Sequence, residues 1–196
     1  DNNGLRSYDL RLSAIEWRAR GLAGQRVPFQ RELRECLGLS ATRGDPDAYR
    51  AAHRELAATL GGRGTAGERL TAHRRRDAVP RERLGPAVRA LSTALRRQAA
   101  SRYGLPAAEA VTYRFVDGAS WSALQTYIGS HRSVVEVNAG AALGAARLPR
   151  LVAHEAYPGH HLECSHGEAA VAEGCAEQGI TLLGSPQTVV SEGLAE

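Results

Sequence analysis

The chain has 196 residues, of which 43% are hydrophobic, and this is enough for one ordinary hydrophobic core. Nothing in its composition requires a second domain, so we predict a single domain over residues 1–196. The net charge is +4, and every one of the 25 basic residues is arginine. The densest basic cluster, His73–Arg76, is followed by Asp77 and lacks interleaved aromatic residues, so we interpret it as a solvated helix face and predict no nucleic-acid partner.

Cysteine usage and hydropathy give two further expectations. Cys36, Cys164 and Cys175 form an odd count without C-x-x-C spacing, which argues against a disulfide framework. A reducing cytosol fits this pattern, and we therefore expect a cytoplasmic protein. No stretch approaches the ~20 consecutive apolar residues of a membrane span, so we predict no membrane partner.

The first 109 residues are predicted to be helical. Apolar residues recur at spacings of three and four, the period of an amphipathic helix, between breaks that contain glycine or proline. Asp45-Pro46 is typical of an N-cap followed by the first helical residue. The predicted helices cover residues 5–22, 28–37, 46–60, 68–76 and 80–103, with a loop over residues 61–67.

The period changes to alternation at Val111–Val116, and this run stops at Asp117-Gly118, as expected for a strand followed by a turn. Residues 124–128 and 133–138 are two further predicted strands. We therefore predict an α+β fold that is mainly helical, with a small sheet at the start of the region 110–196. The helices predicted after the sheet are an alanine-rich run that ends at Leu148, a helix that starts at Pro149, and residues 169–180 and 187–196.

The stretch LVAHEAYPGHHLE, residues 151–163, places three histidines and a glutamate in an apolar run. In an H-E-x-x-H helix, two imidazoles on one face bind zinc and the glutamate acts as general base. Here the residue four after His154 is Pro158, and the next histidines are His160 and His161. On a straight helix these lie ~9 and ~10.5 Å along the axis from His154, too far for one zinc ion with Zn–N bonds of ~2 Å.

Pro158 and Gly159 offer a way to bring the histidines together. Pro158 has no N–H to bond the carbonyl of His154, and its ring pushes the helix open, while glycine tolerates the backbone that a break needs. A helix broken here would fold His160 or His161 back toward His154. The alternative is a helix that ends at the proline, followed by a second helix whose histidines are merely polar.

A carboxylate on a later helix strengthens the metal hypothesis, because SEGLAE at the chain end places Glu192 after the histidines. Two histidines, a glutamate and a water form the catalytic zinc site of the thermolysin type. On His154, Glu155, Pro158-Gly159-His160-His161 and Glu192-Gly193 the chain resembles the bacterial domain of unknown function 885 family. Its signature HE-x-x-PGHH is followed by an EG-containing helix, which usually reads EGWA and here has leucine at the aromatic position. The family is grouped by resemblance with the gluzincin metallopeptidases.

The resemblance implies a gluzincin-like zincin core with a helical N-terminal region. Zn²⁺ would be held by His154, by His160 or His161, and by Glu192. Of the two later histidines we favour His161 as the one that faces the metal. Glu196, one turn after Glu192, would either stand behind it or replace it as ligand.

Several other residues have predicted roles. Glu155 would take a proton from the metal-bound water. His131 is a weaker candidate for stabilising a developing oxyanion. By resemblance to zincins, Ser133–Asn138 is the candidate edge strand beside the metal helix, where a peptide adds to the sheet; the alternative is an ordinary strand of the sheet. A structural zinc site built on Cys164 and His166 is disfavoured, because the paired short spacings of such sites are absent.

The predicted function is therefore zinc-dependent hydrolysis by a metallopeptidase, with a peptide or small-molecule substrate. Two alternatives remain open: a metal-dependent enzyme of another reaction type, and a helical interaction module with a dead site. Metal analysis separates the last from the other two. Because the resembling family continues well beyond its EG helix, we also expect the catalytic unit to extend past Glu196.

Overall fold

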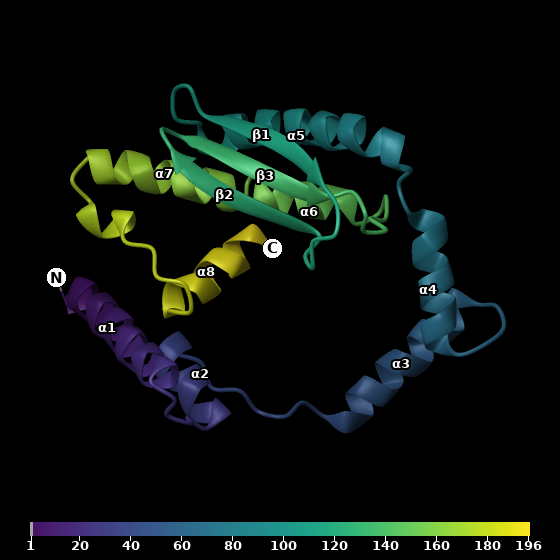
Figure 1. The fold of residues 1–196 in the computed structure, drawn as a ribbon, viewed down its shortest axis with the longest axis horizontal. Helices are drawn as coiled ribbons and strands as arrows, with labels where there is room; N and C mark the ends of the chain where they lie inside the picture. The colour runs from purple at the N-terminus through teal and green to yellow at the C-terminus, as the bar shows by residue number, and fades with distance from the viewer. Residues whose placement is uncertain (1) are drawn as a thin grey trace.

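The computed structural model describes residues 2–196, with side chains from residue 8 onward. A helical N-terminal half is followed by a small sheet and by helices that pack on it, which confirms the predicted fold class (Figure 1). The helices are α1 (Asn2–Leu22), α2 (Phe29–Leu37), α3 (Pro46–Leu60), α4 (Ala66–Asp77), α5 (Arg81–Tyr103), α6 (Leu148–Glu155), α7 (His160–Ala172) and α8 (Pro186–Ala195), and the strands are β1 (Ala110–Val116), β2 (Ala123–Gly129) and β3 (Arg132–Asn138).

Local signals set the ends of the N-terminal helices. Asp45 caps α3 as predicted, because its side chain accepts a hydrogen bond of 2.9 Å from the N–H of Asp47. Thr65 and Glu68 form a reciprocal capping box, so α4 begins at Ala66 and not at the predicted Glu68. In the ribbon, α1 lies against α2 and α3 against α4, as two helical pairs outside the sheet (Figure 1). In the part of the chain described here, no helix is both long and apolar enough to cross a bilayer.

The sheet has the strand order β1-β3-β2, with β1 parallel and β2 antiparallel to β3. The prediction that Ser133–Asn138 is an edge strand is therefore wrong. This segment pairs on both sides. Val135 and Val137 are almost fully buried, and in the central position their backbone groups are also shielded from water by hydrogen bonds within the sheet. The outer strand on the side of α6 and α7 is β2.

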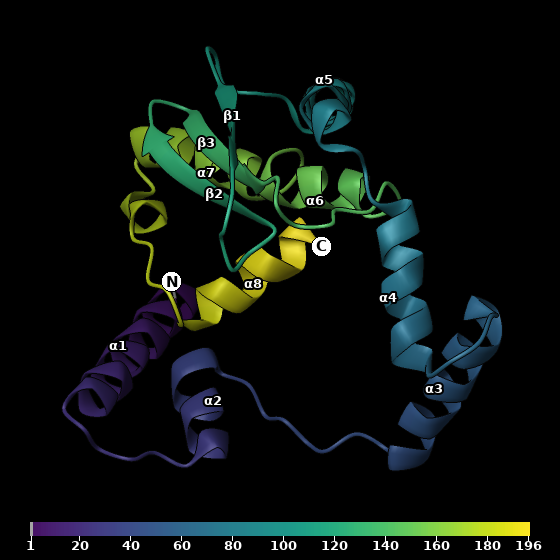
Figure 2. The same cartoon turned by 45° about the vertical axis from the view of Figure 1, so that its right-hand side comes forward.

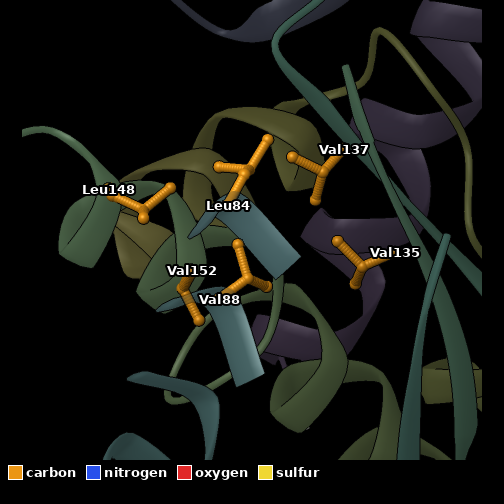
Figure 3. Packing of buried hydrophobic residues seen from close by; sticks show 6 residues of the cluster. All are labelled: Leu84, Val88, Val135, Val137, Leu148 and Val152. Atoms are coloured by element: carbon orange, nitrogen blue, oxygen red, sulfur yellow. The ribbon is translucent and has the colours of Figure 1, made fainter. Parts of the chain in front are cut away.

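The hydrophobic core lies between the sheet and helices α5 and α6. Successive side chains of a strand point to opposite faces, so alternate residues of β3 enter this layer. Full burial of one such side chain contributes roughly 1.5–3 kcal/mol. The contacts fix α6, and with it His154, on the sheet. The buried cluster consists of Leu84 and Val88 from α5, Val135 and Val137 from β3, and Leu148 and Val152 from α6 (Figure 3).

The alanine-rich run before α6 is not helical, contrary to the prediction. Residues 141–147 form turns that are tied to the junction between α4 and α5. The N–H of Ala145 donates to the carbonyl of Asp77 at 2.9 Å, and the N–H of Val79 donates to the carbonyl of Leu143 at 2.8 Å. These tertiary bonds take backbone groups that a helix would have used internally, so alanine's helix propensity is overridden.

The helix predicted over residues 169–180 is also divided. Helix α7 ends at Ala172, Gly174 adopts a φ of 104°, and a short 3₁₀ turn follows at Ala176–Gly179. A φ in this range is open to glycine and costly for other residues, so the helix stops here. The chain then turns back, and α8 runs beneath α6 and α7 with its first turn near α2 (Figure 2).

Candidate metal centre

The break between α6 and α7 is confirmed where it was predicted. Helix α6 ends at Glu155 and α7 begins at His160, and the N–H of Gly159 donates to the carbonyl of Ala153 at 2.9 Å. A Cβ at Gly159 would lie 2.5 Å from the Ala153 carbonyl oxygen and 2.5 Å from the carbonyl carbon of His154, below the 3.0 Å that real Cβ atoms respect. Only glycine allows the two helix ends to meet this closely.

Three helices bring three potential ligands to one point. The Nε2 atoms of His154 on α6 and His160 on α7 lie 3.1 Å apart. From α8, the Oε2 atom of Glu192 lies 3.5 Å from His154 Nε2, and its Oε1 atom lies 3.7 Å from His160 Nε2. One ligand atom from each residue falls within 4.8 Å of the others. Among the described residues, these three side chains are the group of histidine, cysteine and acidic residues that lies close enough together to hold a metal ion.

The spacing of these atoms fits a tetrahedral zinc ion. Ligands about 2.0–2.1 Å from zinc in tetrahedral geometry lie about 3.3–3.4 Å from one another. The two Nε2 atoms, 3.1 Å apart, lie near this value, and each has its own nearest Glu192 oxygen at 3.5 Å (Oε2) or 3.7 Å (Oε1). Two histidines and a carboxylate are also the ligand types of catalytic zinc sites, which leave a fourth position open. The residue types present therefore fit zinc, and the three side chains lie close enough together to share one ion.

The outer nitrogens of both histidines face carboxylates. His154 Nδ1 lies 3.8 Å from Glu196 Oε1, and His160 Nδ1 lies 3.7 Å from Glu163 Oε2. Metal-binding histidines usually direct the ring N–H that is not used for the metal to a carboxylate, which fixes the tautomer. Glu196 thus stands behind His154, and not behind Glu192 as predicted, while Glu192 is the carboxylate grouped with the two histidines.

A small polar cluster orients His160. The hydroxyl of Ser191 donates to Glu163 Oε2 at 2.5 Å and lies 3.4 Å from His160 Nδ1. The Glu163 carboxylate raises the pKa of His160 although burial of the ring opposes it, and the imidazole in turn lowers the pKa of Glu163. The ring is therefore held with Nε2 toward the other two ligands.

Glu155 lies beside the three ligands without belonging to them. Its side chain comes from the last turn of α6 and is buried, with 8% of the residue exposed. Burial raises its pKa, although the neighbouring rings of His154 and His160 oppose this effect. The backbone of Gln125, on the outer strand β2, also acts to lower the pKa of this carboxyl group. A carboxylate whose pKa is raised toward neutrality is suited to accept a proton and return it.

The prediction that His161 faces the metal is wrong. The imidazole of His161 is fully buried, with Nδ1 2.8 Å from Ser133 Oγ and Nε2 2.9 Å from Glu109 Oε2. Neighbouring residues on a helix point about 100° apart. The orientation of α7 that directs His160 toward His154 therefore points His161 toward the sheet.

The buried contacts of His161 form a continuous chain of hydrogen bonds. Gln125 Nε2 donates to Ser133 Oγ at 2.8 Å. Burial lowers the pKa of His161 although Glu109 opposes this, so the neutral ring accepts from the Ser133 hydroxyl and donates to Glu109. Glu109 also accepts from Tyr157 and from Arg96 Nε, the latter at 2.6 Å. The chain ties the start of α7 to the sheet.

Sequence reasoning missed Glu109. It lies 52 residues before His161, in the loop that enters β1, where nothing local marks it as buried. Burial alone would raise the pKa of Glu109, but the hydrogen bonds from Tyr157, His161 and Arg96 outweigh it and hold the pKa below its usual value. Only the tertiary structure reveals these partners.

The predicted role of His131 finds no contact with the centre. His131 lies at the turn between β2 and β3, where its backbone N–H donates to Tyr127 and to Glu168, both at 3.1 Å. Glu168 is two turns beyond His160 on α7, about 12 Å along the helix. Over residues 8–196, no hydrogen bond or ion pair joins His131 to the three ligands, and Cys164 contributes to no group that could hold a metal.

No protein-family model matches the chain, and no curated protein does. Among solved structures, it is similar to "the putative lipoprotein from Colwellia psychrerythraea", with 18% identity and a TM-score of 0.58. The likeness covers 85% of this chain and 32% of that one, so the chain spans about a third of that protein's length. At this identity the likeness shows the fold alone.

Proposed function

We propose that this chain carries the catalytic centre of a zinc-dependent hydrolase, a metallopeptidase that acts on peptides. The observation that carries the proposal is the convergence of His154, His160 and Glu192 from three separate helices. Nothing in the packing of α6, α7 and α8 requires two imidazoles and a carboxylate at their meeting point. The spacing fits zinc, and the buried Glu155 stands beside the ligands.

A zinc ion bound there would polarise a carbonyl group and lower the pKa of a coordinated water toward ~7. Glu155 would accept a proton from that water and pass it to the leaving amine, because burial raises the pKa of its carboxyl group. Strand β2 lies at the edge of the sheet beside α6, and its outward backbone groups would pair with an extended peptide. We therefore propose β2, and not Ser133–Asn138, as the strand to which a peptide substrate adds.

Zinc titration of the purified chain tests the metal centre. We expect about one zinc ion per chain, since one set of ligands is present. His160→Ala and Glu192→Ala should abolish this binding, whereas His53→Ala, an exposed histidine of α3, should leave it unchanged. His161→Ala should weaken folding and leave the three ligands in place. Wild-type protein without zinc affinity, or full affinity in His160→Ala, would remove the basis of the proposal.

The role of Glu155 is tested by Glu155→Gln, which keeps the shape of the side chain and removes the base. We expect normal zinc binding and a loss of about 10²–10⁴-fold in peptide hydrolysis, the usual contribution of general acid–base catalysis. A parallel screen of peptide and ester substrates with the wild-type chain establishes the reaction class. Hydrolysis that survives in Glu155→Gln would assign the base to another group.

A further inference from the structure

A cavity of about 280 Å³ opens beside His154, between the start of α6, the turns that precede it and the end of α8. Leu148 and Leu151 line its apolar part. Arg147 and Arg150 supply its positive charge, and His154 forms one end. A group held in this cavity would therefore lie next to a proposed zinc ligand.

The wall opposite α6 is held in place by backbone hydrogen bonds. The N–H of Val79 donates to the carbonyl of Leu143 at 2.8 Å, and the N–H of Arg147 donates to the carbonyl of Gly144 at 3.1 Å. Gly144 also pairs with Ala78 in an isolated β-bridge. These bonds anchor the turns to the junction between α4 and α5, so the cavity is formed before any ligand enters.

The two arginines of the cavity differ in their partners. Arg150 pairs with the Glu196 carboxylate, so these two charges balance. Over the side chains that the structure describes, from residue 8 to residue 196, the Arg147 guanidinium has neither an ion pair nor a side-chain hydrogen bond. Arg147 is exposed to solvent, so beside the apolar surface of the cavity its guanidinium is free to pair with a ligand.

We propose that this cavity binds a carboxylate of the substrate, and that Arg147 is the residue that selects for it. The planar guanidinium donates two parallel hydrogen bonds to a carboxylate, and the leucine side chains would cover the apolar carbons next to it. The inference rests on the proposed function, since the carboxylate belongs to the molecule that is cut. Its source is either the free C-terminus of a peptide or an acidic side chain.

Binding of a small acid tests the cavity without catalysis. The full chain is treated with a chelator, so that no metal ion can bind the carboxylate, and titrated with 3-phenylpropionate and with its neutral amide by ligand-observed NMR. Hydrogen bonds to charged groups contribute about 1.5–3 kcal/mol, so the acid should bind at least about tenfold more tightly than the amide. Arg147→Gln should remove this preference, and Arg74→Gln, an exposed arginine of α4, should retain it.

Equal binding of acid and amide to the wild-type chain would overturn the proposal, as would a preference that survives in Arg147→Gln. Neither result bears on zinc binding, which the titration above measures separately. A zinc-binding chain with no preference for the acid would therefore refute the carboxylate site and leave the metal centre standing.

Matched peptides identify the source of the carboxylate. One pair differs only in a free or amidated C-terminus, and a second pair has glutamate or glutamine near the cleaved bond. Arg147 should raise kcat/KM about tenfold for the charged member of one pair, by the same interaction that holds the small acid. A C-terminal preference indicates removal of residues from the peptide end, and a glutamate preference indicates recognition of an acidic side chain. Equal cleavage within both pairs would contradict the proposal.

Discussion

Gly159→Ala adds a methyl group at the N-cap of α7 and should damage the metal centre by forcing α6 and α7 apart. The new Cβ would lie 2.5 Å from the Ala153 carbonyl oxygen and closer still to that of His154, where real contacts begin at 3.0 Å. The His154 oxygen is the closest contact, so the start of α7 must retreat from α6 by about 1 Å at least, and by about 1.5 Å to reach ordinary contact. Metal–ligand distances tolerate only about ±0.2 Å, so His160 would leave the position that suits zinc.

We expect Gly159→Ala to bind zinc at least about 100-fold more weakly, beyond the upper range for loss of a supporting contact. Overpacking should also lower the free energy of unfolding by about 1–3 kcal/mol. Zinc affinity is measured by competition with a chromophoric chelator, and stability by urea denaturation of the metal-free chain.

Gly167→Ala is the matched control, since it adds the same methyl group to the middle of α7. There the Cβ would meet only the Gln178 carbonyl oxygen, at 3.8 Å. Zinc affinity should be unchanged, and stability should rise by about 0.5–1 kcal/mol, because alanine favours the helix over glycine. Zinc binding by Gly159→Ala as tight as that of the wild type would show that the close approach of α6 and α7 does not position the ligands.

Three further predictions concern the packing that supports the centre. Leu84→Ala should cost about 2–5 kcal/mol in urea denaturation, whereas Leu194→Ala at an exposed position of α8 should cost little. Glu168→Ala removes hydrogen bonds from the β2–β3 turn and should lower Tm slightly in thermal denaturation. Burial raises the pKa of Glu109, but its hydrogen bonds outweigh burial and hold the folded pKa below the usual value. The ionised carboxylate therefore stabilises the folded chain above about pH 4.3, and this contribution is lost as the pH falls through the folded pKa. Denaturation midpoints across acidic pH should therefore fall less steeply in Glu109→Gln than in the wild type.

The sequence by itself determined the local features of this protein. Helix caps and turn residues depend on neighbours in the chain, so the start of α3 at Asp45-Pro46 and the helix break at Pro158-Gly159 were predictable. The same holds for the positions of the strands, because alternation is a local pattern. The candidate ligands His154 and Glu192 followed from residue type and order.

The tertiary structure alone decided which side chains meet. His160 and His161 are adjacent in the chain, and only the angle at which α7 crosses α6 and α8 sends one to the candidate zinc site and the other to Glu109. The central place of β3 depends on pairing with one strand on each side, which no single segment encodes. The alanine-rich run before α6 does not form a helix, because a backbone hydrogen bond to Asp77, far away in the sequence, outweighs the weak helix propensity of alanine. Long-range contacts thus decide the outcome wherever the local free-energy differences are small.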